Sequence, residues 1–393
     1  MSGISVAVVG AGIGGLSTAA ALRRRGVEVE VFEQAAALGE VGAGVALAAN
    51  GWRLLEQLGV IDRLEATSSA LDNGYYQLRE DGSYIATIRS PGVDGRMRVY
   101  GVHRADLLEV LRSVVPDAVI HTGHRLTGLS QDGDGVELVF ANGASFRADA
   151  VIGADGIHSA VRPHIVEEAA PVSSGQAAYR ALVPVTSDDM WAWGASKIWI
   201  GPGRHILVYP IRADRLLNIV AVVPALGGER DSWSVPGDPR ELANEFAGWD
   251  PVVGDLIDRV QDTFLWGLFD RAQLPTWTDG RVALLGDAAH AMLPHLGQGA
   301  NQTIEDAFAL AAALEGADAA GVPAALALYE GLRYERASTV QRASREFGNL
   351  FDMVERNRFE DRDEAIRRSA SFYAWLNSHD ADSLTPPEPA PSR

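Results

Sequence analysis

A glycine-rich turn close to the N-terminus constrains the fold of this chain more than any other feature of the sequence. A β-branched run over 4–10 leads into the turn Gly10-Ala-Gly12-Ile-Gly14-Gly15, and helical spacing continues over 12–25. A second β-rich run follows over 27–32. This succession of strand, turn, helix and strand predicts a βαβ unit, the half-domain that binds a mononucleotide in Rossmann-like α/β folds.

The glycines of this turn and the acidic residue after the second strand have separate predicted roles. Gly10 permits the tight turn, Gly12 lets the backbone approach a pyrophosphate, and Gly15 allows the helix to pack closely. Glu33 ends the second strand, 21 positions after Gly12. Its carboxylate can accept hydrogen bonds from both ribose hydroxyls and would repel a 2′-phosphate, which disfavours NADP in this site. FAD and NAD both satisfy this pattern.

Two later segments place a carboxylate directly beyond a buried strand. In Val-Ala-Leu-Leu-Gly286-Asp287, the carboxylate of Asp287 can hold the sugar-alcohol chain of a flavin, a group that nicotinamide cofactors lack. In Val-Ile-Gly-Ala-Asp155-Gly156, an acid and a glycine again end a strand. Either segment alone could be an ordinary strand-to-helix turn with Asp as the helix cap.

Together, the three segments resemble the group A flavoprotein monooxygenases, single-component aromatic hydroxylases that include enzymes for salicylate, 3-hydroxybenzoate and 6-hydroxynicotinate. The resemblance extends from Val6 to about Arg345 and includes Arg104-Ala-Asp-Leu and the stretch Pro294–Ala307. It implies FAD as cofactor, NADH or NADPH as transient cosubstrate, and O2. It also implies hydroxylation of an aromatic, phenolic molecule through a flavin C4a-hydroperoxide. The sequence does not distinguish NADH from NADPH.

The resemblance implies roles for particular residues around the cofactor. Asp287 is expected to hold the ribityl chain and Asp155 to serve the pyrophosphate region. Arg104 is expected to give FAD a cationic contact, with a surface arginine at a helix start as the alternative. The loop Gly297–Asn301 is expected under the isoalloxazine ring, and Glu40–Gly44 along its edge. The predicted FAD contacts are Gly10, Gly12, Gly14, Gly15, Glu33, Gln34, Gly44, Val45, Arg104, Leu126, Asp155, Gly156, Gly286, Asp287, Gly297, Gly299, Ala300 and Asn301.

A histidine and a tyrosine are candidates for handling the proton of a phenolic substrate. His205 and Tyr209 stand four positions apart in a predicted strand, so their side chains fall on one face of a sheet. A base at this place would ease attack on the ring by deprotonating its hydroxyl group, and relatives have a similar His and Tyr pair. The alternative is that both residues are structural, with His205 on an edge strand.

Three further residues are predicted on the substrate side. Pro294 is expected to form a wall of a dry pocket, and it joins His205 and Tyr209 as a catalytic candidate. His295 could point at the substrate, or it could be a solvent-facing loop histidine. Arg180 could pair with a substrate carboxylate or a nicotinamide phosphate, or it could form a surface ion pair.

Charge and cysteine content exclude several classes of function. The formal net charge of −18 and the absence of basic runs exclude a nucleic-acid partner. The chain has no cysteine, which excludes disulfides, thiolate metal sites and dithiol redox chemistry, and we expect no metal. It has no apolar run long enough to span a membrane. A cytoplasmic monomer or homodimer is the expectation.

The pattern of strands and helices predicts two interleaved parts. An FAD-binding domain with helices on both faces of a mixed sheet is expected over 1–70, 98–170 and 272–345. An antiparallel substrate sheet is expected over 71–97 and 171–271, and a C-terminal helical segment over 346–382. The proline-rich tail, 383–393, is expected to be disordered.

Other flavin-dependent activities are alternatives to hydroxylation. A halogenase would need the pattern Trp-x-Trp-x-Ile-Pro, which Trp191-Ala-Trp193-Gly-Ala-Ser breaks, and a catalytic lysine, whereas Lys197 is the only lysine. A flavin reductase or desaturase stays open, because FAD motifs do not reveal where the hydride goes. A flavin-binding protein without turnover is disfavoured by the glycine-lined loop after Pro294.

Overall fold

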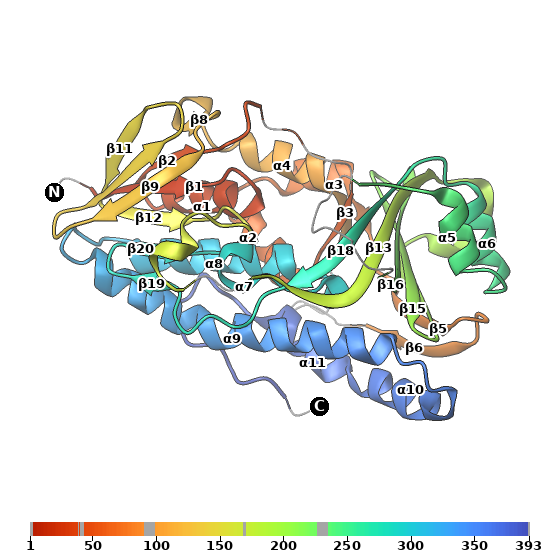
Figure 1. The fold of residues 1–393 in the computed structure, drawn as a ribbon. Coiled ribbons are helices and arrows are strands. Elements are labelled where there is room, and N and C mark those ends of the chain that lie inside the picture. The colour runs from red at the N-terminus through yellow and green to blue at the C-terminus, as the bar shows by residue number, and fades with distance from the viewer. Residues whose placement is uncertain are drawn as a thin grey trace.

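The computed structural model describes residues 3–37, 39, 43–89, 99–167, 170–225 and 235–391. Figure 1 shows two parts side by side, with the long helix α9 running beneath both. The nucleotide-binding part lies on the left of that view and a large curved sheet on the right. The predicted class, a Rossmann-like part combined with a largely antiparallel sheet and C-terminal helices, is confirmed.

The nucleotide-binding part is built on a six-stranded sheet of order β19-β20-β12-β1-β2-β8, parallel except for β19. The first βαβ unit falls within one or two residues of its predicted bounds. The strands are β1 (Ser5–Val9), β2 (Glu28–Phe32), β3 (Gly44–Leu47), β4 (Ser69–Ala70), β7 (Tyr100–His103), β8 (Ile120–His121), β9 (Leu126–Gln131), β10 (Val136–Phe140), β11 (Ser145–Ala148), β12 (Ala150–Gly153), β19 (Thr278–Asp279) and β20 (Val282–Leu284). The helices are α1 (Ile13–Arg24), α2 (Ala49–Glu56), α3 (Ile61–Thr67), α4 (Arg104–Arg112), η1 (Asp117–Val119), η2 (Arg162–His164), α7 (Asp287–His290), η4 (Pro294–Leu296) and α8 (Gly299–Leu314).

A small antiparallel sheet, β9-β10-β11, adds to this part in a way that the sequence did not predict. Alternate residues of β10, Val136, Leu138 and Phe140, are buried in the same core as β1 and β2. This is the two-residue period of a strand with one face covered. The sequence predicted helices on both faces of the main sheet. In the structure α1 and α8 pack against each other over it, and the small sheet provides part of the remaining cover.

The large sheet has eight strands in the order β17-β18-β13-β16-β15-β14-β5-β6. It was predicted to be antiparallel, but β14 and β5 pair in parallel because β5 comes from a separate, earlier piece of the chain. Its elements are β5 (Gly74–Arg79), β6 (Tyr84–Ile88), β13 (Val172–Pro184), η3 (Ser187–Ala192), β14 (Ala195–Gly201), β15 (Arg204–Ile211), β16 (Leu216–Pro224), β17 (Val235–Gly237), α5 (Pro239–Glu245), α6 (Pro251–Asp258) and β18 (Thr263–Asp270).

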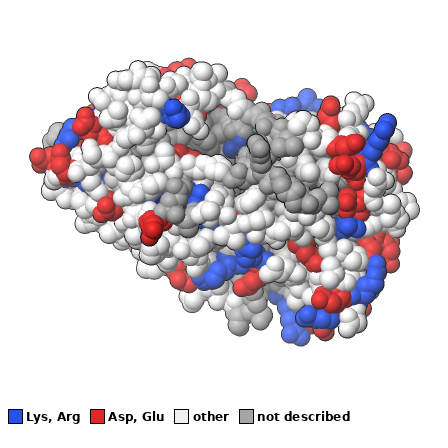
Figure 2. All heavy atoms as spheres, viewed as in Figure 1, with Lys and Arg blue, Asp and Glu red and all other residues white. Residues whose placement is uncertain are grey.

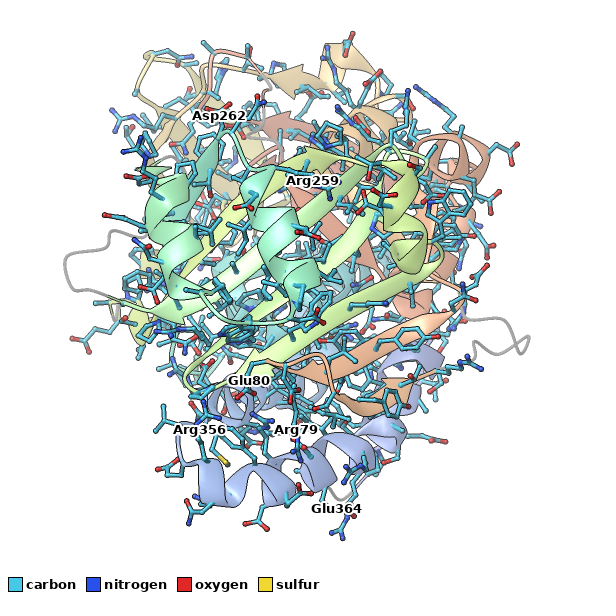
Figure 3. The ribbon with its side chains drawn as sticks, turned by 90° about the vertical axis from the view of Figure 1, so that its right-hand side faces the viewer. Arg79, Glu80, Arg259, Asp262, Arg356 and Glu364 are labelled. Atoms are coloured by element: carbon cyan, nitrogen blue, oxygen red, sulfur yellow. The ribbon has the colours of Figure 1, made fainter. Side chains whose placement is uncertain are left out.

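The two faces of the large sheet have different neighbours. Ile206 and Val208 of β15 pack beneath α5 and α6, which lie in front of the sheet in Figure 3. His205, Leu207 and Tyr209 alternate with them and line a cavity on the opposite face. The sheet therefore forms a wall between the helices and this cavity.

Helix α9 (Val322–Phe351) is unbroken over 30 residues and crosses the predicted boundary at 345/346. The C-terminal segment thus begins only after Phe351, with η5 (Arg356–Arg358), α10 (Phe359–Arg368) and α11 (Ala370–Ser378). Helix α10 packs on β6. Arg79, labelled in Figure 3, extends from β5 to this helix, where its Nε lies 2.7 Å from Asp363 Oδ2.

The tail differs from the predicted disorder over 383–393. The structure describes it as far as residue 391, in a segment without helix or strand. Trp375 of α11 donates a hydrogen bond from Nε1 to the carbonyl of Glu388 (2.9 Å), and Ala390 packs against an apolar cluster that includes α11. Apolar surface on α11 therefore gives this tail contacts that its own composition does not indicate.

Candidate active site

A cavity of about 600 Å³ opens where the carboxyl ends of the parallel strands face the large sheet. Ligands of α/β sheets bind at this edge because the loops after all parallel strands gather there. Sixteen of the eighteen predicted FAD contacts line it: Gly10, Gly12, Gly14, Glu33, Gln34, Gly44, Val45, Arg104, Leu126, Asp155, Gly156, Gly286, Asp287, Gly297, Gly299 and Ala300. The five predicted substrate-side residues also line it: Arg180, His205, Tyr209, Pro294 and His295. Glu40, predicted along the flavin edge, lies outside the described residues.

The other two predicted contacts, Gly15 and Asn301, lie behind the cavity wall. A Cβ on Gly15 would lie 1.8 Å from the carbonyl oxygen of Gly10, so Gly15 is needed for the turn itself. Asn301 is buried and donates hydrogen bonds to the carbonyls of Ala46 (3.0 Å) and Gly297 (2.9 Å). The structure thus gives both residues a supporting role, and their contact with the cofactor stays a prediction.

The glycine turn and Glu33 form the end of the cavity nearest the N-terminus. Gly10 has a φ of +103°, a conformation that glycine adopts without strain. The Glu33 carboxylate accepts hydrogen bonds from the backbone N–H groups of Ala11 (2.9 Å) and Ala35 (2.8 Å). Each carboxylate oxygen has more than one lone pair, so Glu33 retains capacity for ribose hydroxyls. With the N-terminus of α1 beside it, this end fits a ribose and a pyrophosphate.

Substitutions at two nearby glycines should affect protein stability and cofactor binding separately. A Cβ on Gly14 would come within 2.8 Å of Thr303 Cγ2 and 2.9 Å of Leu285 Cδ2. Gly14→Ala should therefore lower the free energy of unfolding by about 1–3 kcal/mol through overpacking. A Cβ on Gly12 would meet nothing within 4 Å, so Gly12→Ala should change stability by less than about 1 kcal/mol yet weaken FAD binding. Denaturation of the FAD-free variants and FAD titration measure these effects, and an equal loss of stability in both variants would contradict the assignment.

Asp287 and Arg104 contribute opposite charges to the middle of the cavity. Asp287 begins α7, and burial raises the pKa of its carboxyl above the usual value, although His290 and Arg104 act in the opposite direction. Arg104 begins α4, and burial lowers the pKa of its guanidinium while Asp287 opposes that shift. A buried carboxylate gains most from hydroxyl donors, which the ribityl chain of FAD provides. Arg104 faces the cavity, so the alternative of a surface arginine is excluded.

Asp155 provides a carboxylate with an unused oxygen. Its Oδ2 accepts hydrogen bonds from the backbone N–H groups of Ala160 (2.7 Å) and Val161 (3.3 Å). Its Oδ1 is buried and has no hydrogen-bond partner among the described residues, and burial raises the pKa of the carboxyl. Direct contact with a pyrophosphate would set like charges together. A hydroxyl group of the cofactor or a bridging water therefore fits Asp155 best.

At the other end of the cavity, His205 and Tyr209 project from an internal strand. Strand β15 lies between β14 and β16, so the alternative of an edge-strand histidine is excluded. Both side chains are buried against the protein and face the cavity. Burial raises the pKa of Tyr209 to about 12, so its hydroxyl stays protonated near neutral pH and serves as a hydrogen-bond donor. Of the pair, His205 is the residue that can accept a proton.

His295 lies in the short helix η4 beside Pro294 and is buried, so the solvent-facing alternative is excluded. Its ring centroid is 5.3 Å from that of His205. Burial lowers the pKa of His295 well below the usual value, and His205 and Arg345 add to that shift. His295 is therefore neutral and forms part of a wall with low polarity.

Arg180 projects from β13 into the same end of the cavity. Its guanidinium carbon lies 4.8 Å from the centre of the Trp266 ring, and its Nη2 donates a hydrogen bond to the carbonyl of Gly44 (3.2 Å). Its Nε is buried without a partner, and no carboxylate of the described residues pairs with it. Burial lowers the pKa of Arg180, while Tyr209 opposes this shift. The structure therefore does not match a surface ion pair and leaves Arg180 available for an anion.

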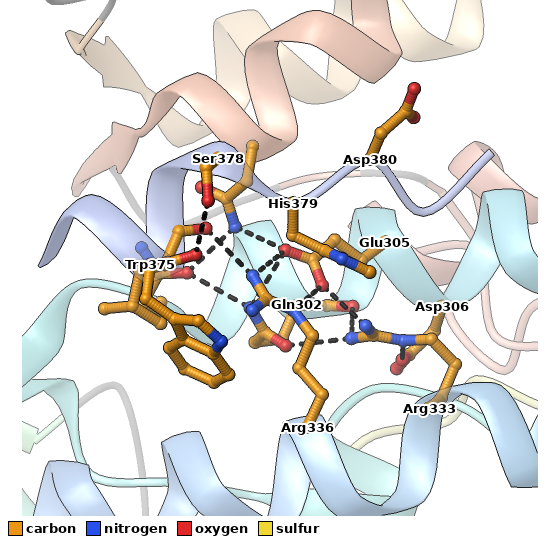
Figure 4. A network of polar contacts seen from close by, with 12 residues as sticks. Gln302, Glu305, Asp306, Arg333, Arg336, Trp375, Ser378, His379 and Asp380 are labelled. Carbon is orange, nitrogen blue, oxygen red and sulfur yellow. Dashed lines mark hydrogen bonds and ion pairs between the residues drawn. The ribbon is translucent and has the colours of Figure 1, made fainter. Parts of the chain in front are cut away.

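Behind the cofactor side of the cavity lies a cluster of buried charges between α8 and α9, drawn in Figure 4. Asp306 accepts hydrogen bonds from the backbone N–H of Gly286 (3.0 Å) and from His290 Nε2 (2.6 Å). Arg333 lies 2.7 Å from Asp306 and 2.5 Å from Glu305. Because Gly286 precedes Asp287, this cluster fixes the turn that presents the Asp287 carboxylate to the cavity.

Several residues that shape the site are not predictable from the sequence. Asp306 lies in the stretch that resembles the family, but the sequence indicates no role for it. Its carboxylate reaches the N–H of Gly286 only because α8 folds back against this turn. Asn218 of β16 accepts the N–H of Gly44 (2.8 Å) and so joins the two parts of the molecule. Phe351 and Asp352 at the end of α9 reach the cavity and the ring of His205, respectively. No local pattern marks residues that act over such separations.

Charge is distributed unevenly between the surface and the cavity. On the face in Figure 2, acidic side chains gather toward both ends of the molecule, in keeping with the net charge of −18. Three arginines, Arg104, Arg125 and Arg180, line the cavity. The carboxylates of Glu33, Asp155 and Asp287 line it as well, so the cavity offers a ligand both cationic and anionic partners. No helix in the described part of the chain has the length and apolar character needed to cross a membrane.

Comparison with known proteins identifies both sequence and structural relatives. Residues 3–344 match the family described as FAD binding domain. A 3-amino-4-hydroxybenzoate 2-monooxygenase of Streptomyces platensis is 38% identical over 96% of each chain. Salicylate hydroxylase of Pseudomonas putida is 35% identical over 97% of this chain and 93% of its own. A solved salicylate hydroxylase substrate complex superimposes with a TM-score of 0.83 at 29% identity, covering 99% of this chain and all of that one.

Proposed function

This chain belongs to the FAD-binding-domain family of flavin-dependent aromatic hydroxylases, and we propose that its substrate is an aromatic acid that carries a ring hydroxyl group. The protein is an FAD-dependent monooxygenase that hydroxylates an aromatic small molecule. The observation that carries the finer assignment is Arg180, a cavity-facing cation without a carboxylate partner among the described residues. A carboxylate on the substrate would supply the missing charge.

Both named relatives support this substrate class. Salicylate and 3-amino-4-hydroxybenzoate, on which they act by name, each combine a ring hydroxyl group with a carboxylate. In this chain the guanidinium of Arg180 lies over the face of the Trp266 indole ring, a position that stabilises a cation. The planar guanidinium can bind a carboxylate through two parallel hydrogen bonds, which also sets the orientation of the ring.

The remaining side chains of the cavity have complementary tasks. His205 accepts the proton of the ring hydroxyl, and Tyr209 donates a hydrogen bond to the substrate. Pro294 and its apolar neighbour Leu293 exclude water, which keeps the reaction coupled. Bound FAD would supply the redox chemistry, taking reducing equivalents from NADH or NADPH and activating O2. The glycine turn, Glu33, Asp155 and Asp287 would hold that cofactor.

We propose the division into an FAD-binding part and a substrate sheet as the functional one, with the C-terminal segment beginning after Phe351. A cytoplasmic monomer or homodimer remains our proposal for the working form.

Arg180→Leu tests the substrate class. In a screen of hydroxybenzoates, hydroxypyridine carboxylates and the matching phenols without a carboxylate, the wild-type protein should prefer the acids. We expect Arg180→Leu to raise the KM for acids by about 10–100-fold, the worth of a hydrogen bond to a charged group. The KM for neutral phenols should change little. Stimulated NAD(P)H oxidation, O2 consumption and hydroxylated product are measured together.

Arg215→Leu is the matched control, because Arg215 ends the turn between β15 and β16 of the same sheet and is exposed. It should leave the preference for acids unchanged. Equal loss of activity toward acids and neutral phenols in Arg180→Leu would show that Arg180 does not bind the carboxylate. NAD(P)H oxidation without incorporation of oxygen into any of these compounds would exclude them as substrates.

A further inference from the structure

We propose that His205 and Asp352 form a proton relay that carries the proton of the substrate's ring hydroxyl from the cavity to solvent. The inference rests on the function proposed above and adds a residue from the end of α9 to the site. His205 contacts the substrate in this proposal. Asp352 is a positioning residue, because it acts through the histidine.

The geometry of the pair connects a closed space with an open one. His205 Nδ1 lies 3.2 Å from Asp352 Oδ1. The histidine side chain is only 5% exposed, whereas the aspartate side chain is 18% exposed. The side chain of His205 makes no other hydrogen bond with the described residues, so Nε2 is the nitrogen left for the cavity. One ring nitrogen can therefore face the substrate while the other faces an acceptor that water can reach.

Few other polar groups surround the imidazole of His205. On the adjacent strands its register neighbours are Ile200 and Val222, which are both apolar. The ring of Phe351 lies 5.3 Å away, centroid to centroid, and packs edge-on. These neighbours offer no alternative route for a proton along the sheet.

The second histidine of this region does not compete for the proton. His295 lies 5.3 Å from His205 between ring centroids. Burial lowers the pKa of His295 well below its usual value, with the charge of Arg345 also contributing, so it remains neutral over the working pH range. Arg345 itself is paired with Asp270 at 2.6 Å. Among the described residues Asp352 is thus the anion in contact with His205.

The end of α9 holds Asp352 in place. Its backbone N–H donates a hydrogen bond to the carbonyl of Gly348 (2.9 Å), which caps the helix. Four residues later Arg356 forms an ion pair with Glu80, the residue after β5 (2.8 Å), and both are labelled at the foot of the sheet in Figure 3. The negative end of the helix dipole also lies here and favours a cationic imidazole. These contacts hold the backbone on either side of Asp352.

The proposed step conserves protons and electrons. The O–H bond of the substrate breaks and an N–H bond forms at His205 Nε2, which leaves a phenolate and an imidazolium ion. The Nδ1–H bond then breaks as the proton passes to Asp352 Oδ1, and the neutral carboxylic acid releases it to water. No electron is transferred. The same path runs in reverse when the ring oxygen of the product takes up a proton.

The ionisation of a bound ligand tests the relay directly. The probe is a nitro-substituted hydroxybenzoate, whose phenol and phenolate forms absorb at different wavelengths, bound to the FAD-loaded protein. We expect Asp352→Asn to move the pH at which the bound probe ionises upward by about one unit, since a neighbouring anion no longer stabilises the imidazolium. The pH profile of kcat for a hydroxylated substrate should move in the same direction. KM should change much less than kcat at low pH.

Two further variants keep the test decisive. Asp352→Glu retains the carboxylate and should restore most of the wild-type profile. Glu355→Gln makes the same change of charge at an exposed position three residues on and should leave the profile unchanged. In a His205→Gln background, Asp352→Asn should add no further shift, because the relay is already broken.

The relay is overturned if Asp352→Asn lowers activity equally at every pH while the probe ionises as in the wild type. It is also overturned if Glu355→Gln produces an equal shift, because that result would indicate a long-range effect of charge. Failure of the proposed function looks different. In that case the wild-type protein itself neither binds the probe nor hydroxylates any phenolic acid.

Discussion

Replacing Arg333 with methionine is expected to lower the free energy of unfolding by about 3–5 kcal/mol, because the change removes a buried cation that two buried carboxylates share. Arg333 contacts both Glu305 (2.5 Å) and Asp306 (2.7 Å), and all three side chains are at most 1% exposed. Methionine fills much of the same volume, so the loss of stability mainly measures the removal of the positive charge. Unfolding by denaturant near neutral pH measures the effect.

Arg342→Met is the matched control on the same helix. Arg342 is 47% exposed and lies 3.4 Å from Glu335, so its loss should change the free energy of unfolding by no more than about 0.5 kcal/mol. Similar values for the two variants would mean that the buried cluster contributes nothing specific to stability. A lower FAD affinity in Arg333→Met would follow from the link between Asp306 and Gly286.

The effect of Arg333→Met should also depend on pH. Burial alone would raise the pKa values of Glu305 and Asp306. Arg336 and Arg333 outweigh this effect at Glu305, so its pKa is lowered. At Asp306, His290 and Arg333 outweigh it and lower the pKa as well. A carboxyl group with a lowered pKa in the folded state stabilises the fold above its unfolded pKa of about 4 and loses that contribution as the pH falls. The difference in the free energy of unfolding between wild type and variant should therefore become smaller below about pH 4.

Replacing Asp287 with alanine should raise the Kd for FAD by about 10–100-fold, the cost of losing hydrogen bonds to a charged group. Asp287 lines the cavity, and burial raises the pKa of its carboxyl, so it gains from donors that a ribityl chain would bring. Fluorescence titration of the FAD-free protein measures the Kd. The fold should persist, because no described residue donates a hydrogen bond to the Asp287 carboxylate.

Asp287→Asn gives an internal comparison. The asparagine keeps one oxygen acceptor at nearly the same place, so its Kd should fall between those of wild type and Asp287→Ala. An unchanged Kd in the alanine variant would remove Asp287 from the cofactor site. Loss of FAD with equal loss of stability would instead point to a structural role.

Local patterns made the nucleotide-binding part predictable. Strand β1, helix α1 and strand β2 lie close to their predicted bounds, since the glycine turn and the period of apolar residues are both encoded within 30 residues. Carboxylates after the strands, such as Asp155 and Asp287, could be placed because parallel strands end at one edge of a sheet. The same reasoning fails for Asn301, where side-chain direction and not position decides what it contacts.

Features that depend on distant contacts could not be predicted from the sequence. The parallel pairing of β14 with β5 joins segments about 120 residues apart. The burial of His295 depends on the end of α9, where a Cβ on Gly348 would lie 2.5 Å from the histidine ring. Asp352 has no motif of its own and reaches His205 only because α9 is long enough. Tertiary contacts of this kind carry no periodic signal.

The unbroken course of α9 limits where this chain can change in length. Arg333 and Arg336 anchor the helix to α8 through Glu305, and Phe351 ends it at the cavity. Inserting one residue between these points would rotate the far end by about 100° and advance it by about 1.5 Å, because a helix transmits length changes rigidly. Extra length is therefore accommodated after residue 351, where the chain leaves the helix.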